Sequence, residues 1–212
     1  MEPIVPAHPE GNPACPDGEG GRAMLSRMNA GNHEQLANWG LDHLSLSGAR
    51  RALDLGCGGG ANLGRLLARM ASGGFAAGLD YSELSVEVSR ETNATAVAEG
   101  RCEVVLGDVS RLPFEDGSFD VVTGFETVYF WPDVEGALSE ALRVLKPGGA
   151  LLICFVLVGV VPAMAEFART VEGMSVYTAS DLESFMSKAG FSDVRADRDP
   201  QTGHMCAIGM RP

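Results

Sequence analysis

The chain has 212 residues, 45% of them apolar, which suffices for one sizeable core and leaves little room for a second. Its 28 acidic side chains outnumber the 16 Lys and Arg side chains, so the formal net charge is −12. A surface of this sign repels phosphate backbones, and the sequence therefore predicts no nucleic-acid partner.

The cysteines are odd in number, widely spaced and free of any C-x-x-C pair. This pattern predicts neither a metal site nor a redox motif, and it favours a reduced, cytoplasmic protein. The five are Cys15, Cys57, Cys102, Cys154 and Cys206.

The N-terminal residues 1–21 are rich in proline and lack the basic start and long apolar stretch of a signal peptide. We expect a flexible tail there, followed by a single domain over residues 22–212. Residues 22–46 carry apolar side chains at partly helical spacings, which predicts one or two helices broken near Gly31. Because these side chains precede the core of residues 50–212, we expect them to form a helical lid.

Strands and helices alternate through the rest of the chain. We predict strands at 51–55, 75–80, 102–108, 118–125, 150–158, 192–198 and 204–210. We predict helices over about 61–71, over 82–100 with Ser82 as N-cap, from Asp133 to Pro147, and over 179–190, with a further segment at 162–172. Residues 147–165 carry no charge, but prolines and glycines interrupt them, so we expect a buried strand and no membrane span.

Such alternation is typical of an α/β fold with a doubly wound, mostly parallel sheet. Ligands of these sheets bind beyond the carboxyl ends of the strands. Asp54, Asp80, Asp108 and the pair Phe125–Glu126 all end predicted strands, so we expect them to converge on one cleft.

A glycine-rich turn, "GCGGGA" at 56–61, follows the first of these strands. It fits a dinucleotide fingerprint, with Asp80 at the distance expected of a ribose-binding acid. It equally fits an adenosylmethionine site. Asp54 would repel a pyrophosphate and attract the ammonium group of a methionine moiety, which favours a zwitterionic ligand.

Four motifs in order resemble those of class I S-adenosylmethionine-dependent methyltransferases: "ALDLGCGGG", "GLDYSE", "GDVSRLPFEDGSFDVV" and "ALRVLKPGGALLI". The resemblance covers about residues 50–157, and "SDLESFMSKAGFSDVRA" is similar to the family's terminal helix and strand. It is strongest to the small-molecule enzymes that include the quinone-biosynthesis methyltransferases. The resemblance implies a Rossmann-like sheet of seven strands, S-adenosyl-L-methionine as cofactor, S-adenosyl-L-homocysteine as product, and a small acceptor, with aromatic molecules among the candidates.

The resemblance also implies roles for single residues. The glycines let the backbone approach the ligand, Asp80 accepts the ribose hydroxyls, Tyr81 lines the adenine pocket, and Asp108 with Val109 meets the adenine edge. Each aspartate alternatively serves as a helix cap or turn residue. The candidate cofactor-binding residues are Asp54, Gly56, Cys57, Gly58, Gly60, Asp80, Tyr81, Ser82, Asp108, Val109, Phe125 and Glu126.

A general base helps when the acceptor is a phenol or a carbon acid. Glu126, His33 and His204 are the candidates by position, although Glu126 also suits a methionine-ammonium contact. The aromatic run Tyr129–Trp131 either stacks on a planar acceptor or packs its loop. Two further readings stay open: a NAD-dependent oxidoreductase of the same topology, and a non-catalytic adenosylmethionine-binding regulator.

Overall fold

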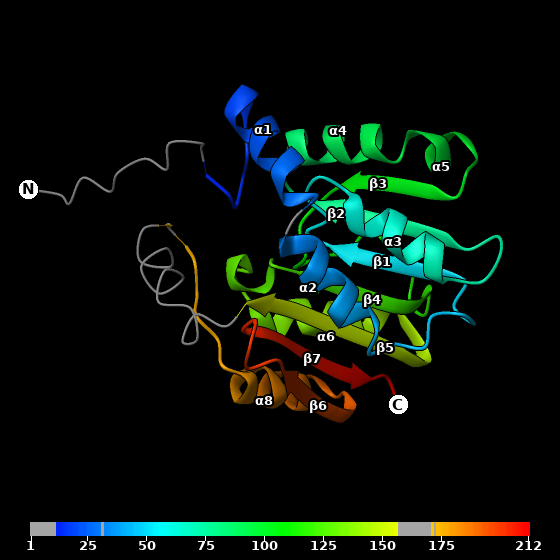
Figure 1. The fold of residues 1–212 in the computed structure, drawn as a ribbon. Coiled ribbons are helices and arrows are strands. Elements are labelled where there is room, and N and C mark those ends of the chain that lie inside the picture. Colours follow the sequence, from blue (N-terminus) through cyan, green and yellow to red (C-terminus); the bar gives the residue numbers. More distant parts are fainter. Residues whose placement is uncertain (1–11, 31, 157–170, 172) are drawn as a thin grey trace, which may run out of the picture.

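A sheet of seven strands forms the centre of the computed structural model, which describes residues 12–30, 32–156, 171 and 173–212. The strands lie in the order β3-β2-β1-β4-β5-β7-β6 (Figure 1). Strand β7 is antiparallel to both of its neighbours, β5 and β6, and the other described strand pairs are parallel. The predicted α/β fold with a doubly wound, mostly parallel sheet is therefore confirmed. The strands are β1 (Arg51–Leu55), β2 (Phe75–Asp80), β3 (Cys102–Leu106), β4 (Phe119–Phe125), β5 (Leu145–Val156), β6 (Ser192–Arg198) and β7 (His204–Met210).

Helices cover both faces of the sheet, because alternate side chains of each buried strand point to opposite faces. Leu53 and Leu55 of β1 belong to the apolar layer under α6 and α8, whereas Ala52 belongs to the layer under α2 and α3. The helices are α1 (Gly18–Met28), α2 (Asn32–Leu41), α3 (Ala61–Arg69), α4 (Glu83–Thr92), α5 (Ala94–Ala98), the 3-10 turn η1 (Val128–Phe130), α6 (Val134–Val144) and α8 (Ala179–Ala189).

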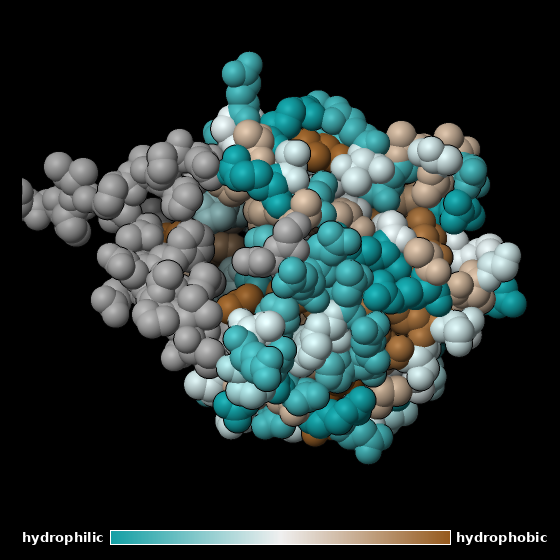
Figure 2. Space-filling view, viewed as in Figure 1, coloured by the Kyte–Doolittle hydropathy of each residue, from teal (hydrophilic) through white to brown (hydrophobic). Residues whose placement is uncertain are grey.

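The N-terminal helices pack beside the glycine turn. Arg22 of α1 forms ion pairs with Glu87 and Glu91 of α4, at 2.6 Å each. The next helix, α2, packs on β5 and α3 (Figure 1). Hydrophilic side chains cover most of the molecular face over α2 and α3 (Figure 2). Leu36, Ala37 and Leu41 of α2 belong to the apolar layer on one face of the sheet, and the expectation that residues 22–46 form a lid stays a prediction.

Several element boundaries differ from the sequence prediction. Helix α1 begins at Gly18, inside the predicted tail of residues 1–21. The helix predicted over 82–100 is broken at Asn93, because its side-chain amide donates to the carbonyls of Gly60 and Ser89. Helix α6 ends at Val144, before Pro147, and β5 begins at once.

Residues 157 and 158 of the predicted fifth strand, and most of the segment at 162–172, lie outside the described residues. Up to Val156, the charge-free stretch that begins at Pro147 belongs to strand β5. Among the described residues, no helix has the length and hydropathy needed to cross a membrane.

Candidate functional site

The glycine turn between β1 and α3 has a backbone that only glycine adopts easily. Gly56, Gly58 and Gly60 have φ angles of 67°, 50° and 82°. A Cβ at Gly56 would overlap the hydroxyl of Thr127, and one at Gly60 would overlap that of Ser89. The turn therefore stays thin and brings its backbone to the carboxyl edge of the sheet.

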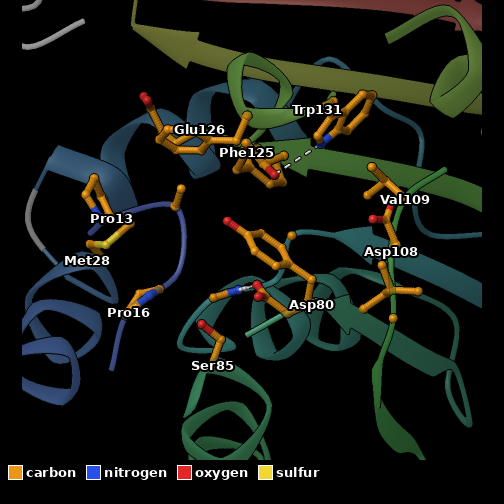
Figure 3. Close-up of a pocket in the computed structure, with 18 of the residues that line it drawn as sticks. Pro13, Pro16, Met28, Asp80, Ser85, Asp108, Val109, Phe125, Glu126 and Trp131 are labelled. Carbon is orange, nitrogen blue, oxygen red and sulfur yellow. Dashed lines mark hydrogen bonds between the residues drawn. The ribbon is translucent and has the colours of Figure 1, made fainter. Parts of the chain in front are cut away.

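A cavity of about 880 Å³, its open mouth included, lies over this turn. Figure 3 shows Asp80 and Ser85 on one wall, Phe125 and Glu126 on the opposite wall, and Asp108 and Val109 at one end. Of the predicted cofactor residues, the lining includes Gly56, Gly58, Asp80, Tyr81, Asp108, Val109, Phe125 and Glu126. The expected convergence of strand ends on one cleft is thus seen for β2, β3 and β4.

Asp80 is held rigidly at the end of β2. Its carboxylate accepts hydrogen bonds from the backbone N–H groups of Gly58 at 2.8 Å and Ser82 at 3.0 Å. Burial raises the pKa of Asp80, and the backbone donors act in the opposite direction. The side chain is only 7% exposed, so its orientation toward the cavity is fixed before any ligand arrives.

Tyr81 and Asp108 form the solvent side of the same cavity. Tyr81 is 49% exposed, and partial burial raises its pKa to about 12, so the phenol stays protonated at neutral pH. Asp108 is exposed and caps its own turn by accepting from the N–H of Ser110 at 2.7 Å. That bond is the turn role considered from the sequence, and it leaves the proposed adenine contact of Asp108 untested.

Glu126 combines backbone strain, burial and position on the cavity wall. It has φ 55°, an unusual value for a non-glycine residue that costs about 1–3 kcal/mol. Its carboxylate accepts from the hydroxyl of Tyr129 at 2.5 Å and from the N–H of Val156 at 2.9 Å. Burial raises the pKa of Glu126 to about 7, and the two donors oppose that shift. A residue whose carboxyl pKa lies near neutral pH thus lines the cavity.

The aromatic residues after β4, Tyr129–Trp131, have two different roles. Phe130 and Trp131 line the cavity, so two aromatic rings face the ligand space. Tyr129 is buried, and its ring packs edge-on against the Phe130 ring with 4.7 Å between the ring centroids. Its hydroxyl donates to the Glu126 carboxylate. The indole N–H of Trp131 donates to Thr127 at 3.2 Å, which fixes the ring (Figure 3).

A second cavity of about 450 Å³ adjoins the first. Both cavities share Met28, Gly56, Gly58, Phe125 and Glu126. The second is closed by Asn29 at the end of α1, by His33 of α2 and by Arg65 of α3, and Cys57 of the glycine turn also lines it. Burial and the nearby charge of Arg65 lower the pKa of His33. Burial raises the pKa of the Cys57 thiol, which is therefore a packed neutral group.

Four predicted site residues lie outside both cavity linings. Asp54 is buried between β1 and β4, where it accepts from the hydroxyl of Thr123 at 2.7 Å, and burial raises its pKa to about 7. Gly60 belongs to the glycine turn, and Ser82 is the N-cap of α4. The backbone N–H of Ser82 also donates to the Asp80 carboxylate. His204 pairs with Val156 at the carboxyl edge as expected of the antiparallel last strand, but it is 6% exposed. The roles predicted for these four residues in the site stay predictions.

The sequence analysis missed part of the lining. Pro13, Ala14 and Pro16 of the predicted tail line the first cavity, and the Ser82 hydroxyl donates to the Pro16 carbonyl at 3.0 Å. The concentration of prolines there was the available signal, since proline favours extended chain that lies on a surface. Arg65 was also missed, because a charged helix residue is usually solvated.

The donor set fits adenosylmethionine. The glycine turn lets a ligand approach its backbone closely, and Asp80 presents two rigidly held carboxylate oxygens. Apolar walls that suit a base and a thioether are formed by Val109, Phe125 and Trp131. Within the described parts of the chain, no group of three or more His, Cys, Asp or Glu side chains is arranged to hold a metal ion.

Comparisons with known proteins agree with this geometry. Residues 53–153 match a family described as a methyltransferase domain. The chain is 32% identical to methyltransferase GfsG of Streptomyces halstedii over 71% of its own length and 53% of the relative. It is 42% identical to demethylmenaquinone methyltransferase of Staphylococcus aureus over 49% of its own length and 42% of that relative. The chain thus spans about half the length, or less, of these curated relatives.

The fold is shared with solved structures. A Haloferax volcanii methyltransferase, solved in complex with the Trm112 methyltransferase activator, superposes with a TM-score of 0.79 at 22% identity. The match covers 90% of this chain and 94% of that one. Together with the ordered motifs and the cavity at the glycine turn, the family match identifies residues 53–153 as a domain of the class I S-adenosyl-L-methionine-dependent methyltransferases, a family named for its cofactor.

Proposed function

We propose that the protein transfers a methyl group from S-adenosylmethionine to a small, largely apolar acceptor that loses a proton in the reaction. The observation that carries this proposal is the placement of Asp80 and Glu126 on opposite walls of one cavity (Figure 3). One carboxylate is fixed for binding hydroxyl groups, and the other has a pKa of about 7 and suits proton transfer.

When bound, adenosylmethionine supplies a methyl group already activated on its sulfonium. The protein must then hold the acceptor in line and exclude water. We assign the exclusion of water to Phe130, Trp131 and Met28 at the cavity wall. We assign the acceptor's proton to Glu126, whose carboxylate is oriented by the Tyr129 hydroxyl and the Val156 N–H.

Glu126 is preferred to the two histidines as the base. It lines both cavities, whereas His33 lines only the second and His204 lines neither. The acceptor class follows from the same wall, since aromatic rings beside a carboxylate suit a phenol, a hydroquinone or a carbon acid. The relative named for demethylmenaquinone is consistent with such an acceptor.

Turnover with a panel of acceptors tests the proposal. The protein is incubated with adenosylmethionine and phenols, hydroquinones, amines or carboxylic acids, and release of adenosylhomocysteine is measured. We expect release with phenolic or quinol acceptors, and little release without an acceptor. Tight cofactor binding with no turnover for any acceptor class would instead favour the non-catalytic regulator.

A further inference from the structure

We infer that Asn29, at the end of α1, is a positioning residue for the cofactor site: its side chain caps α3 and holds the glycine turn in its ligand-binding shape. The residue acts through the turn and not on the ligand. The inference rests on the proposed function only in taking the glycine turn as part of the cofactor site. It makes α1, which precedes the family match at residues 53–153, a structural component of that site.

Helix α3 begins directly at the glycine turn and has no capping side chain of its own. Its N-cap residue is Gly60, which has no side chain to accept a hydrogen bond. The first N–H groups of a helix lack partners within the helix, and Ser, Thr, Asp or Asn at the N-cap position normally accepts from one of them. A turn that is thin enough to admit a ligand therefore cannot cap the helix that follows it.

Asn29 supplies the missing cap from another helix. Its Oδ1 accepts from the N–H of Ala61, the first residue of α3, at 3.3 Å, and its Nδ2 donates to the carbonyl of Gly59 at 2.9 Å. Both polar atoms of the carboxamide are thus bonded to the backbone on either side of Gly60. Because the two bonds span that residue, they fix the path of the chain from the turn into the helix.

The contact between the two helices is reciprocal. The Asn29 carbonyl, at the C-terminal end of α1, accepts from the Arg65 guanidinium of α3 at 3.0 Å. A cation at this end of a helix satisfies a carbonyl that lacks a partner within the helix, and it complements the helix dipole. Each helix therefore caps the other. Met28, the residue before Asn29, lines the cavity, so this joint lies at the cavity wall (Figure 3).

The same contact explains why position 59 is a glycine. Gly56, Gly58 and Gly60 have left-handed backbones, whereas Gly59 does not, so its backbone conformation does not require glycine. A Cβ at Gly59 would lie 2.6 Å from Oδ1 and 2.7 Å from Nδ2 of Asn29. The Asn29 carboxamide thus occupies the space that a side chain at position 59 would need.

Three single variants test this role by calorimetric titration with S-adenosylhomocysteine. Asn29→Ala removes both bonds, and we expect the affinity to fall about 5- to 30-fold, because ligand binding must then order the turn. Gly59→Ala should cause a similar loss, since its methyl group displaces the Asn29 side chain. Asn29→Asp should recover part of the affinity, because a carboxylate still caps Ala61 and only the bond to Gly59 is lost.

A double variant separates one shared role from two independent defects. In Asn29→Ala/Gly59→Ala the added methyl group enters the space that the missing carboxamide has left. We therefore expect no greater loss than in Asn29→Ala alone. Losses that multiply would contradict the inference, because they would show that the two positions act separately.

Hydrogen exchange of the ligand-free protein reports on the turn itself. Asn29→Ala should speed the exchange of the amides of residues 59–63, while the amides of β1 keep their wild-type rates. A side chain that only contacted the ligand would leave the exchange of the ligand-free protein unchanged. A general loss of stability would speed exchange in β1 as well, and either result would contradict the positioning role.

Two matched controls are available. Asn38 of α2 accepts from Arg69 of α3 at 3.1 Å, so Asn38→Ala removes another asparagine bond to the same helix, outside the described linings of both cavities. Gly48→Ala adds a methyl group at a glycine with no left-handed backbone and no atom within 4 Å of the new Cβ. Both variants should bind S-adenosylhomocysteine like the wild type.

The outcomes separate this inference from the proposed function. Wild-type affinity in folded Asn29→Ala and Gly59→Ala proteins would overturn the positioning role and leave the proposed function standing. A wild-type protein that binds NAD but not S-adenosylhomocysteine would overturn the proposed function itself.

Discussion

Asp80 is the residue on which binding of the nucleoside half should depend most. Asp80→Ala removes a fixed pair of acceptors, and each lost bond to a charged group should weaken adenosylhomocysteine binding by about 1.5–3 kcal/mol. Asp80→Asn is the milder variant, because its carbonyl still accepts from one of the two backbone donors, Gly58 or Ser82. Calorimetry measures the affinity, and thermal unfolding verifies the fold. A folded variant with an unchanged dissociation constant would remove Asp80 from the site.

Glu126 should affect both the rate and the pH dependence of stability. A general base typically raises the reaction rate by about 100- to 10,000-fold. Glu126→Gln is therefore expected to lower kcat by that factor, with little change in KM. The carboxylate has an ordinary pKa of 4.5 that burial raises to about 7, so the folded chain holds the proton more tightly than the unfolded chain. Ionisation therefore destabilises the wild type as the pH rises from 4.5 through about 7.

The Gln variant lacks that ionisation. Its melting temperature should exceed the wild-type value at pH 8, and the difference should shrink toward pH 5. Glu103→Gln is the control, because it removes the same charge from an exposed position on β3. A variant whose melting temperature follows the wild type at every pH would contradict the burial of this carboxylate.

At the scale of elements, the segment before α1 forms part of the cavity wall. Pro13, Ala14 and Pro16 line the cavity, and the Ser82 hydroxyl donates to the carbonyl of Pro16. Removing residues 1–17 should weaken adenosylhomocysteine binding by about 2- to 10-fold, which corresponds to the loss of one ordinary hydrogen bond. Removing residues 1–11 is the control and should change the affinity little. Equal affinities of the two truncated chains would show that this segment does not contribute to binding.

The strands illustrate what a sequence alone can establish. The predicted bounds of β1, β2, β6 and β7 agree with the structure. Of these, β1 and β2 are parallel and buried, so they read as short apolar runs, the first followed by Gly56 and the second ending at Asp80. The break at Asn93 was not predictable, because its cause is a bond to the carbonyl of Gly60, a residue 33 positions away.

The same difference between local motifs and long-range contacts decides which site residues the sequence could predict. Gly56, Gly58 and Asp80 were predictable, since a local motif fixes their place at the edge of the sheet. Pro16 and Arg65 were not, because their positions depend on Ser82 and Asn29, which are distant in sequence. The left-handed backbone of Glu126 was also beyond prediction, since its bonds to Tyr129, Cys154 and Val156 hold it in place.

At the scale of the whole molecule, ligand choice should appear as a change in thermal stability. A ligand that binds only the folded chain, at 100 times its dissociation constant, adds about 2.7 kcal/mol. For a chain of 212 residues this corresponds to a rise of about 5–11 °C in Tm. We expect this rise with adenosylhomocysteine and none with NAD at the same ligand concentration, measured by calorimetric scans. The reverse result would favour the oxidoreductase reading.

Cys15 gives the molecule a built-in attachment point for a reporter. It is the one exposed cysteine of the five, and the other four thiols are buried. Its neighbours Ala14 and Pro16 both line the cavity. A thiol-reactive fluorophore would therefore label a single position at the mouth without any mutagenesis, and its emission would follow occupancy in real time. Association and dissociation rates of the cofactor then become measurable on the natural chain.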